Sequence, residues 1–122
     1  MRKTAKPLST AASAAILLGA FAGAPTVSAY DDAVIAEGKK LAFDRKLGNC
    51  LACHQIAGGD LPGNIGPPLI AMQARFPDRK KLYDQIYDAT TRNPDSVMPP
   101  FGRHGALTAE QIDKITTFVH TL

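Results

Sequence analysis

The chain has 122 residues, enough for one small domain, with 14 basic and 11 acidic side chains and a formal net charge of +3. The first 29 residues hold three of the basic residues and no acidic one, so the remaining 93 residues carry 11 of each sign. This even balance gives no support to a nucleic-acid-binding surface. A domain of this size without tryptophan also buries a marginal core, so a disulfide, a metal or another bound group is expected to supplement it.

Residues 1–29 have the three parts of a secretory signal peptide. Basic residues (Arg2, Lys3) precede an apolar run over 11–24, and small residues follow at 27–29. The apolar run is shorter than the roughly 20 residues that a membrane helix needs, which argues against the alternative of a retained anchor. We therefore expect cleavage after Ala29, export to the periplasm, and a single domain over residues 30–122 with no membrane anchor.

Three stretches of the remaining chain have helical periodicity. The first covers 32–46 and has Asp31 or Asp32 as its N-cap. The second covers 78–90, and the third runs from Thr108 to the end, where Gln111 three residues later completes a capping box. No convincing alternating pattern of a β-strand occurs, so the sequence predicts an all-α fold with three main helices.

Two long loops separate the predicted helices. Residues 55–77 contain four glycines and four prolines, and residues 91–107 contain two glycines and three prolines. Loops this long without structure are uncommon in small domains unless they are functional. Loops wrapped around a large, flat, apolar ligand would account for them, because their side chains would pack on the ligand.

The first of these loops follows the two cysteines of the chain, Cys50 and Cys53, with His54 directly after them. Offsets of three and four place the three side chains on one face of a helical turn. Two thiols so placed can add to the two vinyl groups of a porphyrin while the imidazole reaches its iron, which is why C-x-x-C-H indicates covalent attachment of haem c. A plain disulfide, a thioredoxin-like redox pair and a zinc site are weaker alternatives, since the last two lack the expected strand or further ligands.

A haem iron bound by His54 on one side leaves the opposite side for a second ligand. Met98 is the best candidate, because Pro99 and Pro100 restrict the backbone behind it and a thioether suits ferrous iron. Met72 is a rival that we interpret as core filler, and His104 on the same loop is a possible replacement for Met98.

Other loop residues are candidates for supporting contacts with such a haem. A ligating imidazole needs an acceptor for its second N–H, and the carbonyl of Pro67 in the stiff turn GNIGPPL suits this role. Arg75 and Arg103 are candidate partners for the haem propionates, with exposed solvated charge as the simpler interpretation.

The order of GNCLACH, GPPL and MPPF resembles the class I cytochrome c family. The resemblance covers nearly all of residues 33–122 and implies an N-terminal helix that crosses the C-terminal helix at a glycine. Gly38 matches that glycine, and Phe118 with Val119 occupies the place of its partners. The implied fold is all-α, with long loops around one covalent haem.

Longer phrases, GGDLPGNIGPPL, ARFPDR and NPDSVMPPFGRHGALT, resemble the SoxX family, the monohaem cytochrome subunits of SoxAX complexes in bacterial sulfur oxidation. The resemblance implies a heterodimer with a SoxA-type subunit, which houses the reacting haem of this L-cysteine S-thiosulfotransferase. This chain would then accept electrons from the coupling of thiosulfate to the SoxYZ carrier and pass them to another cytochrome, with no catalytic residue of its own. An independent electron shuttle and a haem enzyme with an open sixth position are the alternatives.

Overall fold

A computed structural model describes residues 30–122, and all regular structure in that range is helical. The predicted signal peptide lies outside the described residues, and the expected cleavage site after Ala29 lies at their edge. No helix in the described part of the chain is long and apolar enough to cross a membrane. The predicted all-α fold is confirmed, with four α-helices and two 3-10 turns among these residues: α1 (Asp32–Phe43), η1 (Cys50–Ala52), α2 (Met72–Arg75), α3 (Arg79–Tyr87), η2 (Ala89–Thr91) and α4 (Ala109–His120).

The three long helices begin where side-chain caps satisfy their first free N–H groups. Asp31 accepts from the N–H of Ala33, and Asp78 accepts from the N–H of Lys80. In α4 the predicted capping box is present, since the Thr108 side chain accepts from the Gln111 N–H and the Gln111 side chain accepts from the Thr108 N–H.

The predicted helix ends were two to three residues too late. The helix predicted over 32–46 ends at Phe43, where Asp44 turns to an extended conformation and its carboxylate accepts from the N–H of Lys46. The helix predicted over 78–90 ends at Tyr87, because Asp88 is extended and caps the separate turn η2. In both places an aspartate side chain bonds to the backbone two residues on, which competes with helix continuation.

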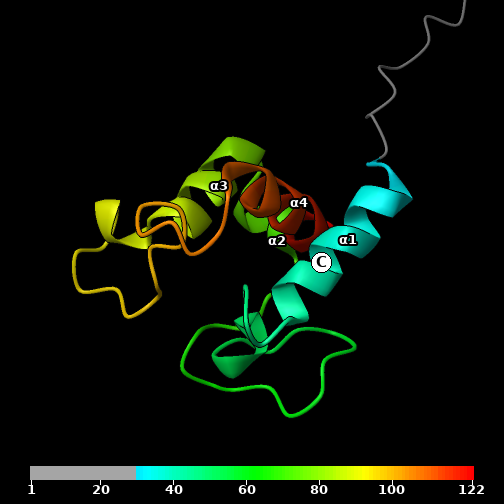
Figure 1. Cartoon of the computed structure of the whole chain (residues 1–122), viewed down its shortest axis with the longest axis horizontal. Helices are drawn as coiled ribbons and strands as arrows, with labels where there is room; N and C mark the ends of the chain where they lie inside the picture. The colour runs from blue at the N-terminus through cyan, green and yellow to red at the C-terminus, as the bar shows by residue number, and fades with distance from the viewer. Residues whose placement is uncertain (1–29) are drawn as a thin grey trace, which may run out of the picture.

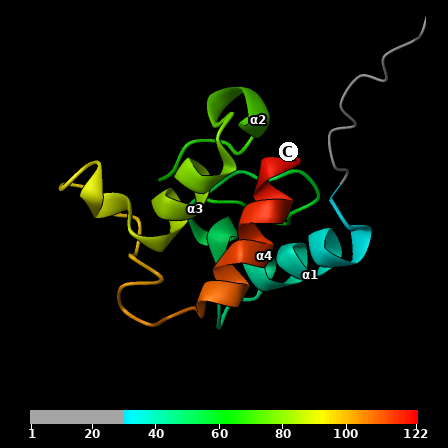
Figure 2. The ribbon, with the colours of Figure 1, turned by 90° about the horizontal axis from the view of Figure 1, so that it is seen from above.

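Helices α1 and α4 cross at Gly38, as the resemblance implied (Figure 2). A Cβ atom on Gly38 would lie 2.1 Å from the Lys114 carbonyl oxygen and 2.9 Å from Cβ of Phe118, so only glycine permits this approach. Beside the crossing, the rings of Phe43 and Phe118 meet edge to face with centroids 6.0 Å apart. Lys114 also forms ion pairs with Glu37 of α1 and Glu110 of α4, at 3.0 and 2.8 Å.

The loop predicted to be without structure over 55–77 contains the one-turn helix α2. It follows Ala71, which has a left-handed backbone (φ +50°), and its first N–H donates to the carbonyl oxygen of Leu122 at 2.8 Å. Met72 on this turn is only 2% exposed and packs in the core with Ile115 and Val119, which agrees with its interpretation as core filler. In Figure 1 the rest of this loop, in green, extends below the helices, while the loop of 92–108 extends to the left.

Candidate functional site

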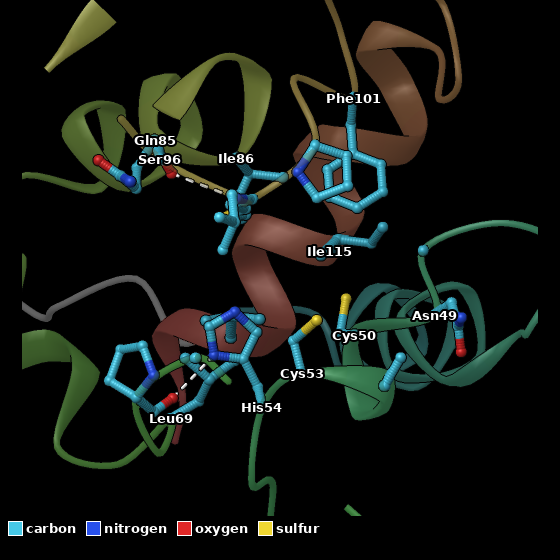
Figure 3. A pocket seen from close by; sticks show the side chains of 18 of the residues that line it. Asn49, Cys50, Cys53, His54, Leu69, Gln85, Ile86, Ser96, Phe101 and Ile115 are labelled. Atoms are coloured by element: carbon cyan, nitrogen blue, oxygen red, sulfur yellow. Dashed lines mark hydrogen bonds between the residues drawn. The ribbon is translucent and has the colours of Figure 1, made fainter. Parts of the chain in front are cut away.

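The two cysteines lie on a tight turn after the short connection 44–49, just before the first long loop. Residues Cys50–Ala52 form a single 3-10 turn rather than the expected α-helical turn, and the N–H of His54 donates to the carbonyl oxygen of Cys50 at 2.8 Å. Gly48 permits the chain to enter this turn, because a Cβ there would be 2.8 Å from the Leu41 carbonyl oxygen and 3.3 Å from the Cys50 sulfur. The turn brings both thiols and the imidazole to the same space (Figure 3).

No disulfide joins Cys50 and Cys53. Burial raises the pKa of Cys50 to about 11, so this thiol is protonated at neutral pH. Thiol–disulfide exchange uses the thiolate, so the raised pKa of Cys50 disfavours it. Within residues 30–122 no group of three or more His, Cys, Asp or Glu side chains lies close enough to hold a metal ion.

His54 has a fixed orientation. Its Nδ1 atom lies 2.7 Å from the carbonyl oxygen of Pro67. A carbonyl oxygen only accepts, so Nδ1 carries the proton and Nε2 keeps its lone pair available for a metal. The preceding residue, Gly66, lies so close to the ring that a Cβ would be 2.5 Å from Cε1 of His54, and the Gly66 N–H donates to the carbonyl of Cys53 at 2.8 Å. The GPP segment therefore holds the imidazole at two points.

A cavity of about 1000 Å³ separates the two long loops. The thiols and His54 line one side, and Met98 and Phe101 of the second loop line the other. Figure 3 shows this opposition: Cys50, Cys53 and His54 lie below the open space, whereas Ser96 and Phe101 lie above it. Side chains of α3 and α4 close the back of the cavity, including Ile86, Ile115 and Val119.

Met98 reaches the cavity wall from a short, internally bonded stretch of backbone. Its N–H donates to Oγ of Ser96 at 3.3 Å, and the Ser96 N–H donates to the Asn93 carbonyl at 3.0 Å. Met72 lines the cavity as well, but its sulfur accepts a hydrogen bond from Arg75 at 3.3 Å. His104 is exposed and does not line the cavity, so the structure does not bring it to this site with Met98.

Of the two arginines predicted to contact propionates, the structure brings one to the cavity. Arg75 lines it and donates from Nη1 to the carbonyl oxygen of Pro68 at 2.8 Å. Arg103 does not line it; its Nε lies 3.1 Å from Oδ2 of Asp88, which is a different partner from the one expected. Two other arginines, Arg45 and Arg92, line the cavity and were not predicted, because neither belongs to a recognisable motif.

The residues present fit an iron porphyrin. The volume lies at the upper end of the range for cofactor sites, roughly 300–1,000 Å³. The wall offers two thiols, one imidazole nitrogen with a free lone pair and, from the second loop, one thioether. Three guanidinium groups and one carboxylate (Asp95) line the same space, so the surroundings suit a ligand that carries negative groups at its edge.

Comparisons with known proteins agree with this fit. The family model for cytochrome c matches residues 35–122. A protein of Aquifex aeolicus (strain VF5) described as an uncharacterized lipoprotein is 42% identical over 79 residues, which are 62% of this chain and 37% of that protein. The chain thus spans well under half the length of this relative. The solved structure of SoxXA from P. pantotrophus is similar with a TM-score of 0.64 and 28% identity, over 70% of this chain and 79% of that one.

Proposed function

This chain belongs to the cytochrome c family, and on that premise we propose that it is a periplasmic, monohaem electron-transfer subunit of a SoxAX complex. Members of the family bind haem covalently and transfer electrons. When bound, the haem supplies one-electron redox chemistry that side chains cannot provide. The single observation that carries the proposal is the placement of His54, oriented by Pro67, across one cavity from Met98 and beside two thiols.

Each residue of this set has a separate task. Cys50 and Cys53 would form thioether bonds by adding their S–H groups to the two vinyl groups, a step that consumes no oxidant. His54 would bind the iron through Nε2, and Met98 would bind the opposite side through its sulfur. If both residues bound the iron, no position there would remain for a substrate, which would suit electron transfer rather than catalysis.

The ligands of the iron, the hydrogen bonds to them and the charges around them would set the reduction potential of the haem. The Pro67 carbonyl accepts a hydrogen bond from the Nδ1–H group of His54 and so increases the basicity of the ligating nitrogen. A thioether ligand favours the ferrous state and raises the potential. Arg75, Arg45 and Arg92 would neutralise the propionates and keep these carboxylates ionised within a partly buried site.

The assignment to a SoxAX complex rests on two supports. The phrases around the cavity, GGDLPGNIGPPL and NPDSVMPPFGRHGALT, resemble the SoxX family. The solved neighbour is SoxXA of P. pantotrophus, similar over most of both chains. We therefore propose a SoxA-type subunit as the partner. Electrons would arrive from the coupling of thiosulfate to the SoxYZ carrier and leave to another cytochrome, while the chemistry at sulfur would belong to the partner.

Co-expression with a SoxA-type subunit tests this function against that of an independent shuttle. The haem-loaded chain should co-purify as a heterodimer, and its haem should become reduced when thiosulfate and the SoxYZ carrier are added. The matched control omits the carrier and should leave the haem oxidised. A monomer that stays oxidised under all these conditions, yet exchanges electrons with an oxidase or another cytochrome, would favour the shuttle.

Export of the mature domain has its own test. We propose cleavage after Ala29, so the purified periplasmic protein should begin at Tyr30 by N-terminal mass spectrometry. Recovery of the chain in the membrane fraction with its first 29 residues intact would contradict this assignment.

A further inference from the structure

The loop that carries Met98 begins and ends at the same place, the C-terminal end of α3 (Figure 1). After Tyr87 the chain passes through η2, extends outward and returns at Gly102, whose N–H donates to the Tyr87 carbonyl oxygen at 3.0 Å. One residue further, Arg103 pairs with Asp88. Residues 88 and 103 thus form the base of the loop, and Met98 lies within it.

The carboxylate of Asp88, at this base, is buried, and both of its oxygens have partners. The side chain of Asp88 is 7% exposed. Its Oδ1 accepts from the N–H and the hydroxyl of Thr90, at 3.0 and 2.6 Å, while its Oδ2 faces Arg103. The hydrogen bond from the Thr90 hydroxyl, aided by the positive charge of Arg103, holds the pKa of Asp88 below its usual value. Asp88 is therefore ionised at neutral pH and bonds to both ends of the loop at once.

The segment of the loop that returns to the end of α3 is also closely packed. A Cβ atom on Gly102 would lie 2.0 Å from Cδ2 of the Tyr87 ring, and that ring is stacked on Tyr83, with centroids 6.1 Å apart. Between the base and Met98, the Phe101 carbonyl accepts from the N–H groups of Ala106 and Leu107, at 2.9 and 3.1 Å. The loop is thus braced along its length, and a shift at its base is transmitted to Met98.

We propose that Asp88 is a positioning residue for Met98: its ion pair with Arg103 closes the base of the loop and so keeps the methionine sulfur at the cavity. This inference rests on the proposed function, in which Met98 binds the iron. The ion pair lies about half in solvent, since the Arg103 side chain is 54% exposed. Its effect is accordingly modest, and the loop can open without unfolding of the domain.

The rate at which imidazole replaces Met98 in the oxidised, haem-loaded protein measures this opening. Asp88→Asn keeps an acceptor for Thr90 but removes the charge, and Arg103→Gln removes the partner from a half-exposed position where folding is not at risk. Asp84→Asn is the matched control, because it removes an exposed pair with Lys80 (2.7 Å) on the same helix. Amide hydrogen exchange over 92–103, compared with α4, provides a second readout.

We expect both single variants to accelerate replacement by about fivefold, as the loss of a partly exposed ion pair implies. The double variant should be no faster than either single one, because one interaction is lost in all three. Asp84→Asn should match the wild type, and hydrogen exchange should rise over 92–103 only.

Two results would overturn the proposal. If the wild type shows methionine ligation and the variants exchange at the wild-type rate, Asp88 does not position Met98, although the proposed function stands. Methionine ligation gives a weak charge-transfer absorption band from sulfur to oxidised iron, the methionine-to-iron band. If the oxidised wild type lacks this band, then both the ligand assignment and the positioning role are wrong.

Discussion

Substitution of Gly66 by alanine tests the placement of His54 most sharply. Among the described residues the glycines with positive φ are Gly58 and Gly105, so alanine at position 66 meets no backbone strain. The new Cβ would instead lie 2.5 Å from Cε1 and 2.7 Å from Nδ1 of His54, where ordinary contacts begin at 3.4 Å. The imidazole or the loop must therefore shift by roughly 1 Å to restore normal contact.

Such a shift has a cost that can be measured in two ways. Overpacking at a built site lowers the free energy of unfolding by about 1–3 kcal/mol, which denaturant unfolding of the haem-loaded protein would detect. Because the ring moves relative to the Pro67 carbonyl, the 2.7 Å hydrogen bond weakens and the reduction potential should change as well. Covalent attachment through the cysteines should persist.

Gly105→Ala is the control. A Cβ at position 105 has nothing within 4 Å, but the φ of +66° makes alanine strained, so stability should fall by about 1 kcal/mol without any change in potential. If Gly66→Ala had the wild-type stability and potential, the ring would not lie against Gly66, and the argument for a fixed imidazole would be refuted.

Three further predictions concern the helix crossing, the loop base and the sulfur ligand. Gly38→Ala should lower the free energy of unfolding by about 1–3 kcal/mol despite the better helix propensity of alanine, because its Cβ meets the Lys114 carbonyl at 2.1 Å; a stabilised variant in thermal unfolding would contradict the crossing. The pKa of Asp88 is lowered in the folded state by Thr90, so its contribution is complete above its ordinary pKa and is lost as pH falls below about 4 through the depressed value. Amide hydrogen exchange over 92–103, corrected for its intrinsic pH dependence, should rise in that acid range, and Asp88→Asn should remove this titration step; an identical acid titration in the variant would refute the link. Met98→Ala should abolish the methionine-to-iron band at neutral pH. If the band persisted in this variant and was lost in a Met72 variant, Met72 would be the ligand and the assignment of Met98 would be wrong.

Local sequence rules were sufficient for the helix starts. A capping aspartate or a Thr–Gln capping box acts within three residues, so the first turns of α1, α3 and α4 are predictable without knowledge of the fold. The same holds for the pairing of His54 with a carbonyl of the GPP turn, because a ligating histidine needs an acceptor and this turn is stiff.

Contacts between distant segments could not be predicted in this way. The one-turn helix α2 exists because Met72 is buried in the core and its N–H reaches the carbonyl of Leu122, 50 positions away in the numbering. Arg103 was only a candidate partner of the propionates or a solvated charge, because the sequence shows its charge but not that the loop returns to the buried carboxylate of Asp88. Arg92 reaches the cavity by the same folding back of the loop, and no local signal distinguishes it from a solvated arginine.

The proposed site depends on Cys50 and Cys53 holding one haem between His54 and Met98. The most direct measurement is the intact mass of the exported protein after denaturation, combined with titration of its free thiols. We predict a mass increase of one haem that survives denaturation, with neither cysteine reactive. Two reactive thiols on a folded protein whose mass matches the polypeptide alone would contradict the claim.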